Sequence, residues 1–329
     1  MGRFHRALHH PLTRYAGPLL GVVCSAIFVS RLDLNEVGTA FGGLAYWWLL
    51  PVLAFGCVNL WLRAVRWGVL LAPAAPLPTS RLLGVGISAA LAGLGLPARG
   101  GDAVKVLLAV RLPGVKLTDV AAAELLERLV DGLIFGSFIS VAALAGGVAG
   151  WPLTLGLGAV AIYLPTLLAI PVAAWFLGSR AAAPDASGPA WHPRRLLQHA
   201  VGAAHRRGPR LLVRAAQLSV LAWAAEAASY YCLLVAFGWL APPTLPFAAV
   251  GVANFAFAVP GAPAGVGTFH VPVSSLLVDG FGAEPGLAAA YAVVLHVAVL
   301  APVPLVWVLM EARRRWHDRA VRAMHINLP

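Results

Sequence analysis

Residues 121–133 read AAAELLERLVDGL, and four charged side chains interrupt this otherwise apolar stretch. They are Glu124, Glu127, Arg128 and Asp131, at spacings i, i+3, i+4 and i+7. A helix would stack all four on one face, because residues three and four positions apart are neighbours on a helix surface. The stretch therefore predicts an apolar helix with one charged stripe, and such a stripe needs charged partners or a polar cavity to face.

The composition of the whole chain is that of a membrane protein. Of its 329 residues, 60% are hydrophobic and 11% are charged, whereas about a quarter of the residues in a soluble domain are charged. The mean hydropathy is +0.81. Apolar runs recur along the chain, and about 20 residues suffice to cross a hydrocarbon core about 30 Å thick. Because these runs do not alternate as barrel strands do, we predict an all-α polytopic membrane protein.

The basic residues predict how the chain is oriented. The net charge is +11, and the arginines gather near the N-terminus, at 180–214 and at 313–322. No RNA- or DNA-binding motif stands among them, so the positive-inside rule explains the charge better than a nucleic-acid partner does. We therefore expect both termini in the cytoplasm and the chain in the cytoplasmic membrane. The alanine-, arginine- and proline-rich composition is typical of a GC-rich bacterial genome.

Six apolar runs are interpreted as full spans, and two further runs are broken. The full spans are expected near residues 17–30, 44–62, 120–149, 152–177, 212–239 and 287–310. The first broken run covers about 82–96 and is interrupted at Pro97 and Gly100-Gly101, and the second breaks within VPGAPAGVG, residues 259–267. We predict that both are re-entrant hairpins, because irregular backbone at membrane depth must be buried in protein or line a cavity.

The two halves of the chain repeat the order span, span, hairpin, span. The first hairpin would enter from inside and the second from outside, which is the pattern of an inverted-topology repeat. A short echo, Pro97-Ala98-x-x-Gly101 and Pro263-Ala264-x-x-Gly267, agrees with it. We expect one integral membrane domain over 1–329, with a cytoplasmic N-terminus at 1–16, half-repeats at 17–151 and 152–310, a cytoplasmic loop at 179–211 and a basic cytoplasmic tail at 311–329.

Four stretches, in this order, carry a family resemblance. They are NLWLRAVRW in the second span; Pro97, Arg99, Gly101 and Asp102 in a P-x-R-x-G-[ED] turn; Glu127, Arg128 and Asp131 in an E-R-x-x-D span; and PGAPAGVGTFH, ending at His270. Together they resemble the lysylphosphatidylglycerol synthase transmembrane, or flippase-like, family. Two positions depart from its usual pattern, because Asp102 stands where glutamate is commoner and His270 stands where many relatives have glutamate.

The resemblance implies a lipid-handling function. Relatives are associated with aminoacylated phospholipids, polyprenyl-linked sugars and hopanoid transport, so it implies translocation of an anionic phospholipid or a lipid-linked precursor. The best-known relatives, the multiple peptide resistance factors, also carry a soluble aminoacyl transferase domain. Because the chain ends shortly after its last span, we expect the membrane domain alone and no synthase activity.

The candidate substrate-binding residues come from the two broken runs and the charged span. They are Arg99, Gly101, Asp102, Lys105, Glu127, Arg128, Asp131, Gly265, Gly267 and His270. In the functional interpretation they line a polar cavity where arginine holds a phosphate headgroup in a bidentate manner. In the alternative, the charged members form a structural ion network that pins the first hairpin.

Individual roles follow from charge and position. Because the stripe has two more acids than bases, it needs further cations, for which Arg99 and Lys105 are the expected sources. Arg99 and Arg128 would bind the headgroup, while Glu127, Asp131 and His270 would balance charge or carry a proton.

Other polar residues have less specific expected roles. Gly265 and Gly267 would offer backbone N–H groups to an anion or simply allow close helix packing. Glu124 is expected at the interface, and Arg63 with Arg66 as cytoplasmic anchors at the end of the second span. Glu226 and His296 are expected to find partners across the bundle.

The sequence favours a transporter over an enzyme. It lacks H-E-x-x-H, G-x-S-x-G and a P-loop, so no catalytic motif and no cofactor is predicted. Two alternatives stay open: an intramembrane lipid-headgroup transferase or hydrolase that uses Glu127, Asp131 and His270, and a non-transporting scaffold. The expected partners are membrane lipids, with a homo-oligomer or envelope-lipid biosynthetic enzymes as further possibilities.

Overall fold

The computed structural model describes residues 11–30, 33–71, 77–96, 100–177, 193–259 and 263–326, and every element within them is helical. The prediction of an all-α polytopic membrane protein is therefore confirmed. The elements are α2 (Pro11–Ser30), α3 (Leu34–Gly42), η1 (Tyr46–Trp48), α4 (Leu49–Leu71), α5 (Thr79–Gly95), α6 (Gly100–Ala109), α7 (Leu117–Gly146), α8 (Trp151–Leu177), α9 (Pro193–Ala236), α10 (Leu245–Ala258), η3 (Pro263–Gly265), α11 (His270–Ser275), η4 (Leu276–Gly280), α12 (Pro285–Leu300) and α13 (Pro302–Ile326).

Within the described residues, five helical stretches are long and apolar enough to cross a membrane. They are Tyr46–Leu71, Leu117–Gly146, Trp151–Ala169, Arg210–Ala236 and Pro285–His317. These five agree with five of the six expected full spans. The first expected span lies in α2, whose stretch Leu19–Ser30 is a shorter apolar helix.

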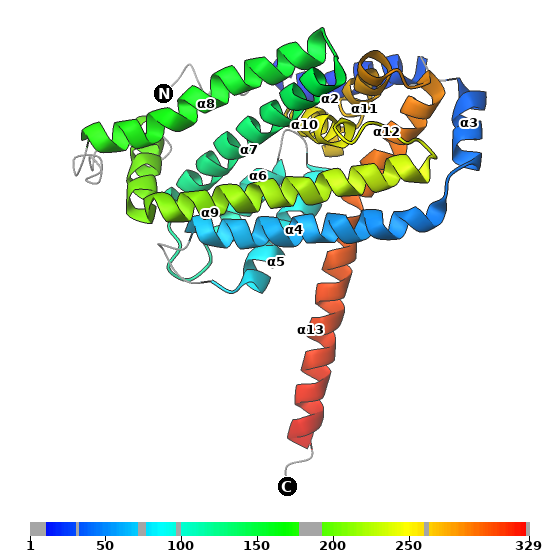
Figure 1. The fold of residues 1–329 in the computed structure, drawn as a ribbon. Helices are drawn as coiled ribbons and strands as arrows, with labels where there is room; N and C mark the ends of the chain where they lie inside the picture. The colour runs from blue at the N-terminus through cyan, green and yellow to red at the C-terminus, as the bar shows by residue number, and fades with distance from the viewer. Residues whose placement is uncertain are drawn as a thin grey trace.

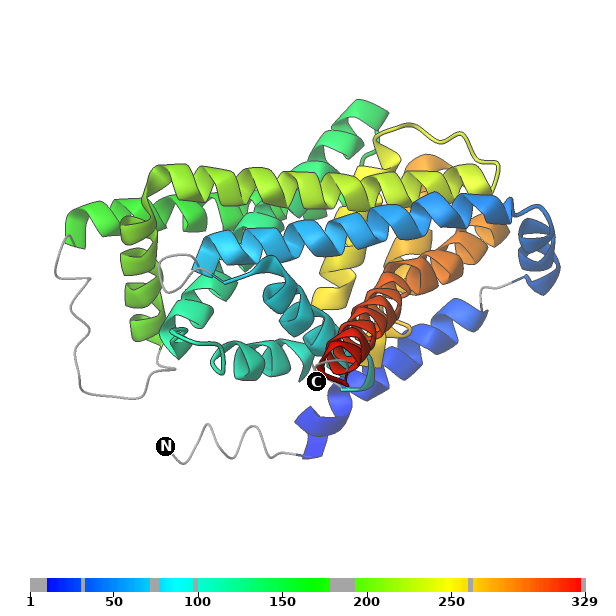
Figure 2. The same cartoon turned by 90° about the horizontal axis from the view of Figure 1, so that it is seen from below.

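Four long helices, α4, α7, α8 and α9, form the body of the molecule, and α4 and α9 lie side by side along much of their length (Figures 1 and 2). α7 is the central helix, because it packs on α8, α9 and α10. More than half of the candidate span in α7 is buried inside the protein. α13 projects away from this body (Figure 1).

Glycines allow the close approach of α7 to its neighbours. A Cβ on Gly136 would lie 2.8 Å from the Cβ of Ala159 in α8, and a Cβ on Gly251 in α10 would lie 2.8 Å from the Phe135 carbonyl oxygen. Lipid tails are as apolar as leucine, so membrane helices gain little from burying apolar side chains against each other. They associate instead through close packing, which small residues allow. α7 can therefore hold its charged side chains away from lipid.

The first broken run is interrupted where the sequence predicts. α5 ends at Gly95 and α6 begins at Gly100, and the two helices pack against each other as a hairpin. A Cβ on Gly101 would lie 2.6 Å from the Ala89 carbonyl oxygen, so Gly101 serves the close contact between the two helices. Arg99 and the rest of 97–99 lie outside the described residues.

The second broken run is also interrupted at its expected place. α10 ends at Ala258, and after η3 the chain resumes as α11 at His270. Gly265 and Gly267 have φ of 73° and 83°, a left-handed conformation that glycine adopts readily. A Cβ on Gly267 would lie 2.8 Å from the backbone nitrogen of Ser25 in α2, which supports the close-packing interpretation of this glycine.

Two expected boundaries are wrong. Residues 179–211 were expected to form a loop, but α9 begins at Pro193 and includes 193–211, while 178–192 lie outside the described residues. The ribbon of α9 bends sharply in its first half (Figure 2). The sequence of this helix includes Pro209, and a proline inside a helix removes a hydrogen bond and bends the axis. The second span was expected to end near residue 62, but α4 continues to Leu71.

Candidate functional site

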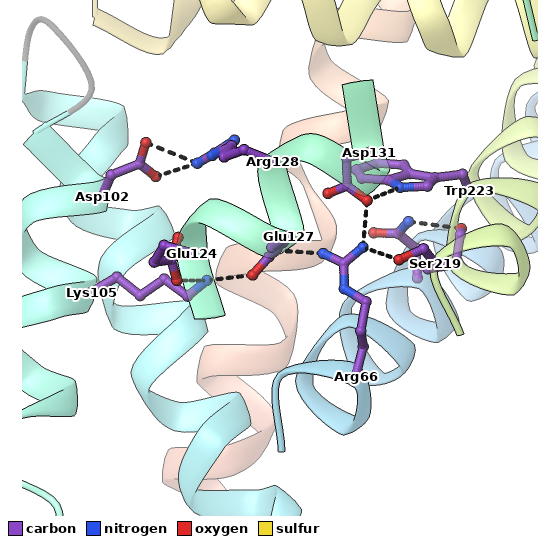
Figure 3. Close-up of polar contacts among 11 residues, drawn as sticks. Arg66, Asp102, Lys105, Glu124, Glu127, Arg128, Asp131, Ser219 and Trp223 are labelled. Carbon is purple, nitrogen blue, oxygen red and sulfur yellow. Dashed lines mark hydrogen bonds and ion pairs between the residues drawn. The ribbon is translucent and has the colours of Figure 1, made fainter. Parts of the chain in front are cut away.

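A buried arginine from α4 binds the charged stripe of α7. Arg66 has no exposed side-chain surface, and its Nη2 donates to Glu127. Its Nη1 donates to Oδ1 of Asp131 at 2.5 Å and to Oγ of Ser219 in α9 at 2.8 Å. Figure 3 shows this guanidinium between the two carboxylates and the α9 hydroxyl. One side chain therefore ties together the three helices α4, α7 and α9.

The network continues on both sides of Arg66. On the α9 side, Trp223 donates its indole N–H to Oδ1 of Asp131 at 2.7 Å. On the α6 side, Nζ of Lys105 lies 2.6 Å from Glu124 and 3.2 Å from Glu127. Lys105 therefore supplies one of the cations that the stripe was expected to need.

Arg128 pairs with an acid of the first hairpin. Its Nη2 lies 2.9 Å from both carboxylate oxygens of Asp102 on α6, and both side chains are 45% exposed. Figure 3 shows Arg128 extending toward Asp102, away from the side of the helix that meets Arg66. The α5–α6 hairpin therefore supplies the ion-pair partner of Arg128.

A cavity of about 420 Å³ opens among these helices. Its polar lining comes from α4, α6, α7, α9 and α10: Asn59, Arg63, Asp102, Lys105, Glu127, Arg128, Asp131, Glu226, Ser229, Tyr230 and Asn254. Apolar walls include Trp67, Phe135, Tyr163 and Phe257. Such a volume is within the range of small-molecule sites in proteins. The polar cavity that the charged stripe predicts is therefore present.

Arg63 is a further cation of the cavity, and its charge acts on Glu127 and Glu226. Its guanidinium carbon lies 5.2 Å from the centre of the Trp223 ring. Among the described residues, no carboxylate lies within ion-pair distance of it. A guanidinium over an aromatic face keeps its edge free for a carboxylate or phosphate.

Glu226 of α9 lines the same cavity. Its Oε1 accepts hydrogen bonds from the Tyr230 hydroxyl and the Asn254 amide, each at 3.1 Å. The expectation that Glu226 finds a partner across the bundle is confirmed, because Asn254 lies on α10.

Two expectations about the charged residues need correction. Arg66 is not a cytoplasmic anchor, because it is buried among α4, α7 and α9. Glu124 is not an exposed interfacial residue either, because its side chain is 16% exposed and pairs with Lys105. The excess of acidic residues on the α7 stripe could have predicted the buried position of Arg66, because buried acids need cations from a neighbouring helix.

His270 belongs to a separate group. It lies next to His296 of α12, with His296 Nδ1 3.2 Å from His270 Nε2, so the expectation that His296 finds a partner is confirmed. Neither ring lines the charged cavity. The structure therefore divides the candidate residues between a charged cavity, with Asp102, Lys105, Glu127, Arg128 and Asp131, and the second broken run, with Gly265, Gly267 and His270.

The charged cavity offers ion pairs and the guanidinium of Arg63. Within the described residues, no three His, Cys, Asp or Glu side chains gather as metal ligands would. Asp102, Glu127 and Asp131 pair with cations of the chain itself, whereas Glu226 accepts hydrogen bonds from neutral side chains. Arg63 has no carboxylate within ion-pair distance among the described residues.

Comparison with known proteins gives one informative result. No curated protein sequence gives a significant match to the chain. The family model described as the lysylphosphatidylglycerol synthase TM region matches residues 15–306, which include both broken runs and every described charged residue of the cavity. The chain is therefore a multi-pass membrane protein that belongs to the family of the lysylphosphatidylglycerol synthase transmembrane region, a family whose name points to a lipid-related membrane function.

Proposed function

We propose that the chain is a flippase-like transporter and not an enzyme. Its cargo would be a lipid with an anionic headgroup, either a phospholipid or a polyprenyl-linked precursor, and the cargo would cross the cytoplasmic membrane. The observation that carries this proposal is the guanidinium of Arg63, which lines a polar cavity of about 420 Å³ and has no carboxylate within ion-pair distance in the described part of the chain. A charge in a span is costly unless it has a partner, so such an arginine in a cavity is suited to an anionic ligand.

The charged residues divide into two roles. Arg63 and the half-exposed Arg128 would contact the headgroup, because both line the cavity and neither is buried in a network. Glu127 and Asp131 would hold the helices together through Arg66, since both are buried and bonded to it. Arg99 remains a proposed ligand whose position lies outside the described residues.

Transport would proceed by alternating access around the cavity. The two broken runs would act as re-entrant hairpins of an inverted repeat, with the cavity between them and both termini in the cytoplasm. Broken helices in corresponding halves are typical of transporter binding sites. The headgroup would occupy the cavity while the lipid tails stay in the bilayer. Other proposed partners are a second copy of the chain or envelope-lipid biosynthetic enzymes.

Proteoliposomes would test the proposal. The probes are tail-labelled fluorescent phosphatidylglycerol and fluorescent polyprenyl phosphate, with dithionite used to quench the label in the outer leaflet. We expect the wild type to move at least one probe faster than protein-free liposomes, and Arg63→Gln to lose most of that rate. Arg315→Gln, at a 70% exposed residue of α13, is the matched control and should retain it.

Two results would reject the proposal. One is that neither probe moves faster with the wild-type protein than without it. The other is that Arg63→Gln, correctly folded, moves lipid at the wild-type rate. Consumption of a labelled lipid in detergent, with a new product, would favour the transferase or hydrolase alternative instead.

A further inference from the structure

Two histidines join the second broken run to α12. His296 Nδ1 lies 3.2 Å from His270 Nε2, and His296 Nε2 lies 2.8 Å from the carbonyl oxygen of Ala264. His270 is the first residue of α11, and Ala264 lies in the interruption between α10 and α11. The pair therefore links the interruption and the start of α11 to α12.

The hydrogen bonds fix which nitrogens carry protons. A carbonyl oxygen only accepts, so His296 Nε2 must carry the hydrogen in that bond. Neutral His296 then has a lone pair on Nδ1, which accepts from an N–H on Nε2 of His270. The remaining basic nitrogen of the pair is Nδ1 of His270. A proton can be added at this atom without breaking either hydrogen bond.

Apolar rings surround the pair. Phe28 of α2 lies 4.9 Å from the His270 ring, and Phe269 and Phe257 lie 4.7 and 5.8 Å from the His296 ring, centre to centre. The described side chains of α2, α10, η3 and α11 include no acid or base besides His270. The elements that pack on α11, α12 or η3 carry further acidic or basic residues, and in the described structure none of them pairs with either ring. They are Glu36 (α3), Arg63 and Arg66 (α4), Arg81 (α5), Arg210, Arg214 and Glu226 (α9), Asp279 (η4), and Glu311, Arg313, Arg314, Arg315, His317 and Arg319 (α13).

The pair holds a strained point of the backbone next to the cavity. Ala264 has φ of 56°, and it is the one non-glycine residue with positive φ among the described residues. Its carbonyl is the group that His296 holds. Phe257, which contacts His296, also lines the charged cavity. The pair therefore touches both the interruption and the cavity wall.

We propose that the neutral pair of His270 and His296 fastens the interrupted second helix, and that the pair takes up a proton when the interruption opens. The added proton would enter at His270 Nδ1 and make that ring an imidazolium. While the rings are joined, this cation lies among phenylalanine rings with no described carboxylate beside it, which is costly. Opening of the interruption would let water reach the cation and remove that cost. By reciprocity, protonation favours opening, and the neutral pair favours the joined rings.

In a transporter this site would couple a proton to the movement of the second broken run, and that use of the site rests on the proposed function. The proton-binding site itself does not depend on the identity of the cargo. Its tests below use no lipid substrate, so their failure and the failure of lipid transport can be distinguished.

Thiol labelling of the interruption would test the fastening. Cys24, Cys57 and Cys232 are first replaced by alanine. The labelling rate of Val266→Cys then measures how accessible the interruption is, because Val266 is 47% exposed. Val297→Cys on α12, 64% exposed, is the matched control, and the ratio of the two labelling rates removes the intrinsic pH dependence of a thiolate. From about pH 8 to about pH 5, where histidine gains its proton, we expect the ratio to rise about fivefold, a usual size of coupling between sites.

His270→Gln separates titration from hydrogen bonding. The glutamine amide keeps an N–H donor for Nδ1 of His296 but does not titrate, so the labelling ratio should no longer change with pH. A ratio that does not rise in the protein with both histidines, or that rises equally in His270→Gln, would overturn the proposal.

Nitrogen NMR of the histidine-labelled wild-type chain in nanodiscs gives a second test without any substitution. We expect Nε2–H tautomers for both His270 and His296 at high pH, and the first added proton on Nδ1 of His270. Another tautomer for either ring, or first protonation of His296, would contradict the assignment.

Discussion

The two broken runs are interrupted in the same way but are held by different interactions. The α5–α6 hairpin is fastened to α7 by charge, through Lys105 with Glu124 and Arg128 with Asp102. The second run is held by two histidines, by phenylalanine rings and by the close approach of Gly267 to α2. One interruption therefore borders a network of ion pairs, and the other borders a pair of histidines among aromatic rings. In the proposals above, the first borders the headgroup site and the second borders the proton site.

The largest expected effect tests the charged side of this comparison. Arg66→Gln leaves Glu127 and Asp131 buried without the arginine that binds both, and removing one partner of a buried ion pair costs about 3–5 kcal/mol. We expect a clear loss in the midpoint of thermal unfolding in detergent. Arg63→Gln, one turn earlier on α4 and without an ion pair, is the control and should unfold near the wild-type temperature. Equal stability of Arg66→Gln and the wild type would show that the network does not hold α7.

A second prediction concerns the close contact within the first hairpin. Gly101→Ala places a methyl group 2.6 Å from the Ala89 carbonyl oxygen, and overpacking of this kind costs about 1–3 kcal/mol. Gly86→Ala on α5 is the matched control, because no atom lies within 4 Å of its added Cβ. Unfolding in denaturant should therefore separate the two variants, with Gly101→Ala the less stable. If both behave alike, the α5–α6 contact is looser than the structure shows.

The smallest expected effect concerns the exposed ion pair of the hairpin. Arg128→Gln breaks a pair whose side chains are both 45% exposed, and exposed pairs contribute below about 1 kcal/mol. We expect an unfolding midpoint close to that of the wild type but weaker retention of anionic lipid. The unfolding midpoint and the amount of co-purified anionic lipid would both be measured for Arg128→Gln. A loss of stability as large as that of Arg66→Gln would contradict the prediction and place Arg128 in the structural network.

The sequence predicts the helical class, both interruptions and most of the charged cavity, because these depend on apolar runs, on Gly and Pro and on the spacing of charges along one helix. It does not predict Arg66, whose role depends on where α4 crosses α7. Arg63 and Arg66 are three positions apart in one sequence stretch. Only the packing of the helices buries Arg66 and leaves Arg63 in the cavity lining. The partner of Arg128 was missed for the same reason, since the hairpin brings Asp102 from 26 positions away.

The central claim is that Arg63 marks a headgroup site, and the most direct measurement is mass spectrometry of the lipids that co-purify with the protein. Wild type, Arg63→Gln and the control Arg315→Gln would be purified in parallel. The account predicts one anionic or polyprenyl-linked lipid enriched over the membrane average with the wild type and the control, and lost with Arg63→Gln. The same bulk lipids with all three proteins would contradict it and leave the charged residues a structural network.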